Sequence, residues 1–125
     1  MWALLLVGIF AGDSPFFKGT VEQVLEKAKA EKKLVLVDVY TTWCGPCKLM
    51  DRTTFQDEAV VDFLTNKVIA YKIDAEKGEG IALARKYRVA GFPCILILDG
   101  SGKLVDRQLG YLPARYFLNW VNNVL

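Results

Sequence analysis

Cys44 and Cys47 are separated by two residues, and they are the pair of side chains in this 125-residue chain with the clearest chemistry. They follow a run of residues with high β propensity over 34–40, and they lie at the start of a segment whose pattern predicts a helix. A Cys-x-x-Cys pair at the start of a helix forms a dithiol that closes to a disulfide and reopens. The spacing therefore predicts a reversible redox site.

The spacing also indicates which cysteine attacks. Thiol–disulfide exchange requires the thiolate, which is roughly 3% of a free cysteine at pH 7. Lowering the pKa from about 8.5 to about 7 corresponds to about 2 kcal/mol. The N–H groups and dipole at a helix N-terminus supply about 0.3–1 kcal/mol, or about 2 when partly buried, and the partner thiol supplies the remainder. We predict that Cys44, at the mouth of the helix, is the nucleophile and that Cys47, one turn in and more buried, resolves the mixed disulfide.

The residues beside the cysteines fit the start of a helix. Pro46 suits the first turn, where its missing N–H costs nothing. Gly45 is expected to let the backbone turn tightly and to leave the sulfur accessible. Lys48 either adds positive charge near the thiolate or is simply a solvated helix residue.

Zinc binding and a purely structural role fit the cysteine pair less well. A tetrahedral zinc site needs four ligands, whereas the chain has three cysteines and no histidine, so Asp or Glu would have to contribute. A purely structural disulfide would close a very short loop and constrain the unfolded chain little. The strand before the pair and the helix after it favour redox chemistry, with no metal.

The sequence over residues 37–48 resembles the active-site segment of the thioredoxin superfamily. Residues 89–93 resemble the segment that carries the family's cis-proline, and Gly110 matches the glycine that lines the family's peptide groove. Residues 74–80 resemble a stretch of exported bacterial single-domain thioredoxin-like proteins of the disulfide isomerase or thiol:disulfide interchange type. The resemblance covers most of residues 16–125. It implies a thioredoxin-like α/β fold, a three-layer α/β/α sandwich with a central mixed β-sheet.

The resemblance also implies how a substrate is held. Pro93 is expected to pack against the dithiol and to expose the backbone of Phe92 for pairing with a substrate peptide, as in β-augmentation. Alternatively, Pro93 merely begins the buried strand that follows it. Trp43, Tyr40 and Phe92 are expected to surround the sulfur with apolar docking surface. Tyr40 is alternatively half core, because aromatic residues are common at strand ends.

Asp38 is a carboxylate within an otherwise apolar strand, which is costly without a partner or a task. The resemblance implies that it lies beneath the dithiol and moves the proton of Cys47, with a pKa raised by burial. The alternative is a satisfied structural aspartate. The family often places a lysine beside this aspartate. Counting along the next strand puts Ala70 there, with Lys72 as a substitute two residues further on.

Cys94, directly after Pro93, departs from the threonine-like residue of the family. It is either a third redox thiol near the pair or, as burial statistics favour, an inert packed thiol.

Composition and length restrict the remaining possibilities. A chain of this length is one domain, and a hydrophobic content of 53% excludes a disordered chain. The net charge of +2, with scattered basic residues, gives no sign of a nucleic-acid partner. Residues 1–12 are apolar but too short to span a bilayer. They are expected to be a signal remnant or an extra strand before a thioredoxin-like domain over 13–125.

Apolar periodicity and turn residues predict the order of elements. The expected strands cover 16–18, 34–40, 68–74, 94–98 and 104–109, with a hairpin turn over 99–102. The expected helices cover 20–32 with a capping-box start, 44–53, 57–64 capped by Asp57, 80–87 and 113–124.

These features predict an enzyme that reduces or isomerises protein disulfides through Cys44 and Cys47. Their dithiol carries both electrons, so we expect no bound cofactor. The Gly-Pro pair between the cysteines resembles reducing members of the family, because the strong oxidants usually place histidine before the second cysteine. The expected partners are substrate proteins with disulfides and an upstream dithiol electron donor. The protein itself is expected to be a monomer. The expected compartment is the periplasm or another exported location, with the cytoplasm as the alternative. The competing hypothesis is a partner- or peptide-binding module in which redox chemistry is incidental.

Overall fold

The computed structural model describes residues 14–125. The predicted signal remnant or extra strand over 1–12 lies outside the described residues. Elsewhere the elements fall within one or two residues of the predicted bounds, apart from the first strand and one additional short helix. In chain order they are α2 (Val21–Glu31), β1 (Val35–Tyr40), α3 (Gly45–Arg52), the 3-10 helix η1 (Thr54–Gln56), α4 (Glu58–Asn66), β2 (Ile69–Asp74), α5 (Glu79–Lys86), β3 (Cys94–Leu98), β4 (Leu104–Leu109) and α6 (Ala114–Val124).

Side-chain caps define where several elements begin. Thr20 and Gln23 form the predicted capping box of α2. Asp57 caps α4 by accepting hydrogen bonds from the backbone N–H groups of Ala59 and Val60. In the β3–β4 turn, an oxygen of Asp99 accepts hydrogen bonds from two backbone N–H groups, which fixes the predicted hairpin.

The strand predicted over 16–18 is wrong. Phe17 forms only an isolated bridge to Tyr71, with its N–H donating to the Ala70 carbonyl at 2.7 Å. Pro15 has no N–H to extend the pairing, and the α2 cap at Thr20 follows within three residues. The segment therefore touches the edge of β2 at a single point.

Within residues 14–125, four strands form one mixed sheet in the order β2-β1-β3-β4. β1 runs parallel to β2 and antiparallel to β3, and β3 runs antiparallel to β4. The parallel pair needs a crossover, which α3, η1 and α4 provide, whereas β3 and β4 are joined by a tight turn. This arrangement confirms the predicted mixed sheet.

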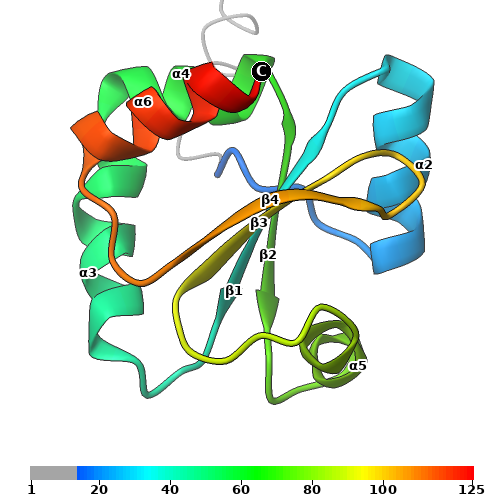
Figure 1. The fold of residues 1–125 in the computed structure, drawn as a ribbon, viewed down its shortest axis with the longest axis horizontal. Helices are drawn as coiled ribbons and strands as arrows, with labels where there is room; N and C mark the ends of the chain where they lie inside the picture. Colours follow the sequence, from blue (N-terminus) through cyan, green and yellow to red (C-terminus); the bar gives the residue numbers. More distant parts are fainter. Residues whose placement is uncertain (1–13) are drawn as a thin grey trace, which may run out of the picture.

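Helices cover both faces of the sheet (Figure 1). α2 and α5 pack on the face that carries Val37 and Leu96. α3, α4 and α6 pack on the other face, where Leu36 and Phe117 are buried. The alternation of side chains along each strand divides the core into two layers, which confirms the predicted α/β/α sandwich. No helix within residues 14–125 has both the length and the apolar character needed to cross a membrane.

Candidate active site

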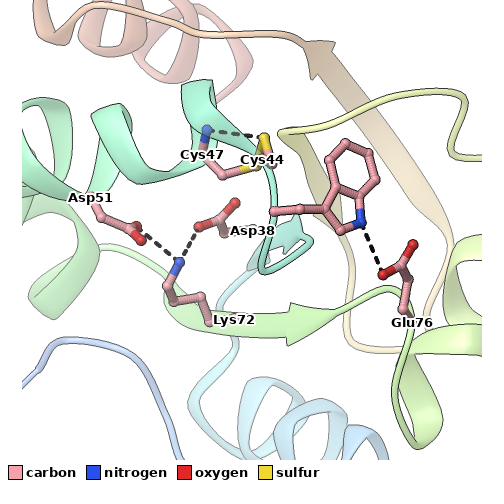
Figure 2. Close-up of a disulfide and its surroundings, with 7 residues drawn as sticks. Asp38, Cys44, Cys47, Asp51, Lys72 and Glu76 are labelled. Atoms are coloured by element: carbon pink, nitrogen blue, oxygen red, sulfur yellow. Dashed lines mark hydrogen bonds and ion pairs between the residues drawn. A yellow bond between two sulfur atoms is a disulfide. The ribbon is translucent and has the colours of Figure 1, made fainter.

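Cys44 and Cys47 form a disulfide at the N-terminus of α3, with their Cα atoms 5.3 Å apart (Figure 2). Cys44 is the N-cap of the helix, and its Sγ accepts a hydrogen bond from the Cys47 N–H at 3.1 Å. Pro46 lies in the first helical turn, as predicted. The loop from the end of β1 to α3 therefore places both sulfurs where free N–H groups and the helix dipole favour a negative charge.

Two local expectations are not met. Both cysteines are 3% exposed, so the prediction that Cys47 is more buried is wrong for the disulfide form, in which each sulfur covers part of the other. Hydrogen bonding distinguishes them instead, because only Cys44 caps the helix. Gly45 has no left-handed backbone, and a Cβ there would meet no atom within 4 Å. The tight turn expected at Gly45 is therefore wrong, because the residue simply begins α3.

Asp38 is buried on β1 and faces the α3 side of the sheet. Its Oδ2 accepts a hydrogen bond from Lys72 Nζ at 2.8 Å, and Lys72 also bonds Asp51 Oδ1 at 2.9 Å. The parallel register places Lys72 opposite Asp38 and Ala70 opposite Leu36, so counting Ala70 as the companion position is wrong. The register, which the strand sequence alone does not give, makes Lys72 the partner.

Asp51 was not among the predicted site residues. It lies on α3 one turn beyond Cys47, at the i,i+4 spacing that places two side chains on the same helix face. Because Asp51 and Asp38 hold the same ammonium, the face of α3 that carries Cys47 lies against Asp38. Figure 2 shows the Asp38 carboxylate drawn between the disulfide and Lys72. The Cys-x-x-Cys-x-x-x-Asp spacing was the signal available in the sequence.

The pKa values of Asp38 and Lys72 depend on how deeply each side chain is buried and on the charge beside it. Burial raises the pKa of Asp38, while the Lys72 ammonium opposes the increase without cancelling it. Burial alone would lower the pKa of Lys72, but the carboxylates of Asp38 and Asp51 outweigh that effect and raise it. The second oxygen of Asp38, Oδ1, is buried without a hydrogen-bond partner among the described residues. Asp38 is thus a buried acid whose pKa lies above its usual value, even beside the Lys72 ammonium.

Trp43 and Phe92 form an apolar surface next to the disulfide. The Trp43 side chain is 64% exposed and meets the Phe92 ring edge to face, with centroids 6.0 Å apart. Its Nε1–H donates to Glu76 Oε1 at 3.0 Å, a partner that the sequence did not predict (Figure 2). Tyr40 does not join this pair, since its ring lies 4.4 Å from Lys72 Nζ.

Pro93 is buried, and the Phe92–Pro93 peptide bond is cis. The Gly110 N–H donates to the Pro93 carbonyl at 2.8 Å, and Gly110 has a φ of 97°, which favours glycine. Within residues 14–125, neither the N–H nor the carbonyl of Phe92 takes part in a backbone–backbone hydrogen bond. The structure therefore brings Phe92, Pro93 and Gly110 together at one end of β3.

Cys94 is a free, buried cysteine in the layer below α2 and α5. Burial raises the pKa of its thiol, and Arg107 opposes the increase. The sheet separates this thiol from α3, because Cys94 and Asp38 alternate to opposite faces. No cluster of three or more His, Cys, Asp or Glu side chains that could hold a metal ion occurs within the part of the chain that the structure describes.

This fold and this site define a thioredoxin-like protein. The chain belongs to the thioredoxin-like domain family, whose model matches residues 21–125. It is 36% identical over 107 residues to the thiol:disulfide interchange protein DsbD of Pseudoalteromonas atlantica, covering 83% of this chain but 18% of the relative. The chain thus spans less than a fifth of that relative's length.

Solved structures give the same class. A solution structure of a protein provisionally assigned as a disulphide isomerase, from Bacteroides thetaiotaomicron, is 38% identical with a TM-score of 0.78, covering 87% of this chain and 90% of that one. The oxidised C-terminal domain of Neisseria meningitidis DsbD is 26% identical with a TM-score of 0.71, covering 88% of this chain and 99% of that domain. The similarity to DsbD is therefore to one domain of a longer protein.

Proposed function

We propose that the chain is a thiol–disulfide oxidoreductase that reduces or isomerises protein disulfides through Cys44 and Cys47. The observation that carries the proposal is a disulfide at the N-terminus of α3, with a buried carboxylate on the strand beneath that helix. Relatives named for thiol:disulfide interchange and disulphide isomerisation support it. A structural disulfide needs neither a capping N–H nor a buried acid below it.

The reduced protein acts in two exchange steps. The Cys44 thiolate attacks one sulfur of a substrate disulfide, forms a Cys44–substrate disulfide and releases the other substrate sulfur as a thiolate. Cys47 then attacks Cys44 Sγ, closes the protein disulfide and releases the second substrate thiolate. Two electrons pass to the substrate. The Cys47 N–H that bonds Cys44 Sγ stabilises that sulfur as an anion, both as nucleophile and as leaving group.

Asp38 serves the second step. Cys47 must lose a proton before it attacks, and Asp38 faces the side of α3 that carries Cys47. Because burial raises the pKa of Asp38, the carboxylate is a stronger base than a solvated aspartate. Lys72 keeps the ionised form accessible, so that the carboxyl group both accepts and returns the proton.

A substrate peptide docks across the surface formed by Trp43, Phe92 and Gly110, beside the buried Pro93. The backbone of Phe92, which forms no backbone–backbone hydrogen bond among the described residues, offers both a donor and an acceptor to an extended chain, which is β-augmentation with little sequence preference. Trp43 supplies apolar contact beside the sulfur. Glu76 fixes the plane of its ring.

The same chemistry indicates which cofactor, electron donor and cellular compartment the reaction requires. The dithiol carries the electrons, so the protein needs no bound cofactor, and an upstream dithiol donor restores its reduced form. We assign the reaction to the periplasm or another exported location, because protein disulfides are abundant in oxidising compartments and residues 1–12 have the apolar character of a signal core.

Insulin reduction coupled to a dithiol donor tests the proposal. Cys44→Ser should abolish turnover, whereas Cys47→Ser should accumulate a mixed disulfide that mass spectrometry detects. Cys94→Ala is the matched control, because its thiol lies on the opposite face of the sheet, and it should keep wild-type turnover. If Cys44→Ser loses insulin reduction but the variant still performs the role of the protein in the cell, the chain is a binding module rather than an oxidoreductase.

A further inference from the structure

The ammonium of Lys72 lies within a box of aromatic rings. Its Nζ is 4.4 Å from the ring centroid of Tyr40, 5.7 Å from that of Phe16 and 6.0 Å from that of Phe55. Each distance is within the range at which the face of a ring attracts a cation. The three rings come from β1, the N-terminal segment and η1, so the box depends on parts that are distant in sequence.

Of the three rings around Lys72, that of Phe16 lies outside the residues that the family model matches. The family model begins at Val21, and Phe16 precedes it. Its ring packs edge to face on Phe55 with centroids 5.5 Å apart, and its N–H donates to Ser14 Oγ at 3.1 Å. The neighbouring bridge from Phe17 to Tyr71 holds this segment at the edge of β2. The segment therefore attaches beside the strand that carries Lys72.

A cavity of about 490 Å³ lies beside the Phe16 ring, and Lys72 itself borders it. Phe16, Phe55, Lys18, Asp51 and Lys72 are among the residues that line it. Without the ring of Phe16, the Lys72 side chain could extend into that cavity toward water and away from Asp38. Lys18 also borders the cavity, and its like charge opposes this movement, so we expect Lys72 to enter the cavity for only part of the time.

We propose that Phe16 is a positioning residue of the redox site: it closes the aromatic box around Lys72 and so fixes the cation that partners Asp38. The inference rests on the proposed function only in linking Asp38 to the proton of Cys47. Phe16 touches neither the disulfide nor the surface formed by Trp43 and Phe92. Its proposed effect on Asp38 passes through Lys72.

The charged groups around Lys72 determine the expected direction. Asp38 bonds it from β1 and Asp51 from α3, while Lys18, from the N-terminal segment, borders the same cavity. A Lys72 side chain that spends time in the cavity stabilises the Asp38 carboxylate less. Loss of the Phe16 ring should then raise the pKa of Asp38, because the opposing effect of Lys72 weakens.

Phe16→Leu tests this inference, because leucine keeps apolar cover while it removes the ring. Phe17→Leu is the matched control, since Phe17 is adjacent but packs in the layer of α2 and α5. Titration of the Asp38 carboxyl carbon by NMR in the oxidised protein should show a pKa raised by about half a unit in Phe16→Leu. Phe17→Leu and Phe16→Tyr, which retains a ring, should titrate like the wild type. Phe16→Met replaces the leucine variant if that protein does not fold.

The Lys72 ammonium gives a second readout that needs no catalysis. Its ¹H–¹⁵N signal should exchange with water several-fold faster in Phe16→Leu than in Phe17→Leu. An unchanged signal and an unchanged Asp38 titration would overturn the proposal. Because both measurements use the disulfide form, they give an answer even if the insulin assay rejects the oxidoreductase function.

Discussion

At the scale of single residues, Asp38 combines a favourable position for proton transfer with a cost in stability. Its carboxyl group is 2% exposed, one oxygen bonds Lys72 and the other has no partner among the described residues. An unsatisfied buried polar atom costs about 1–3 kcal/mol. The residue therefore stabilises the fold least when it is ionised, which is the state that the proposed function requires as a base.

Asp38→Asn should stabilise the oxidised protein increasingly as the pH rises. The pKa of Asp38 is raised on folding, so the native state binds more protons than the unfolded state between the ordinary and the raised value. Wild-type stability therefore falls as the pH rises through that window, and an asparagine does not titrate. We expect a gain of about 1 kcal/mol or more at pH 8 and much less at pH 4.

Urea unfolding at a series of pH values measures this difference. Asp62→Asn replaces an exposed aspartate on α4 and should reproduce the wild-type dependence on pH. An Asp38→Asn curve that stays parallel to the wild-type curve would show that the burial of this carboxyl group carries no energetic cost. In the insulin assay, the same variant should be slow in resolving the mixed disulfide.

At the scale of elements, local signals and long-range pairing differ in how well the sequence predicts them. The cysteine pair, the caps at Thr20 and Asp57 and the β3–β4 turn depend on residues within a few positions, and the structure contains all of them. The partnership of Asp38 with Lys72 depends on the register of two strands, which no local pattern fixes. Phe16 was predicted as part of a strand, and its position beside Lys72 follows only from tertiary packing.

The approach of α5 to β2 gives a prediction at this scale. Gly80 is buried in α5, and a Cβ added there would lie 1.7 Å from the Asp74 carbonyl oxygen at the end of β2. Because that oxygen belongs to the backbone, the helix itself would have to move. Gly80→Ala should therefore destabilise the protein by about 3 kcal/mol, although alanine normally favours a helix.

Gly45→Ala is the matched control for stability. A Cβ at Gly45 would meet nothing within 4 Å, and the residue has no left-handed backbone. Its free energy of unfolding should stay within about 0.5 kcal/mol of the wild type. If both substitutions are equally mild in urea unfolding, close contact between α5 and β2 is not required for stability.

At the scale of the whole molecule, one sheet connects the core layer under α3, α4 and α6, which is the side of the disulfide, to the core layer under α2 and α5. Leu96 is fully buried under α2 and α5, while its neighbours Ile95 and Ile97 face α3, α4 and α6. β3 lies between β1 and β4, and its side chains alternate between the two faces of the sheet, so it contributes to both layers. The site on α3 should therefore depend on packing in the layer that it does not touch.

Leu96→Ala should lower the free energy of unfolding by about 2–5 kcal/mol, because it opens a cavity in a fully buried position. Both layers should still unfold in one transition, as expected for a single domain of this size. Methyl NMR signals of Val37, in the layer of α2 and α5, and of Val121, in the layer of α6, should therefore disappear at the same urea concentration. Ile81→Ala, at an exposed position on α5, should change the midpoint little. If the Val121 signal outlasts that of Val37, the two layers are separate cooperative units and the redox site is independent of the core behind the sheet.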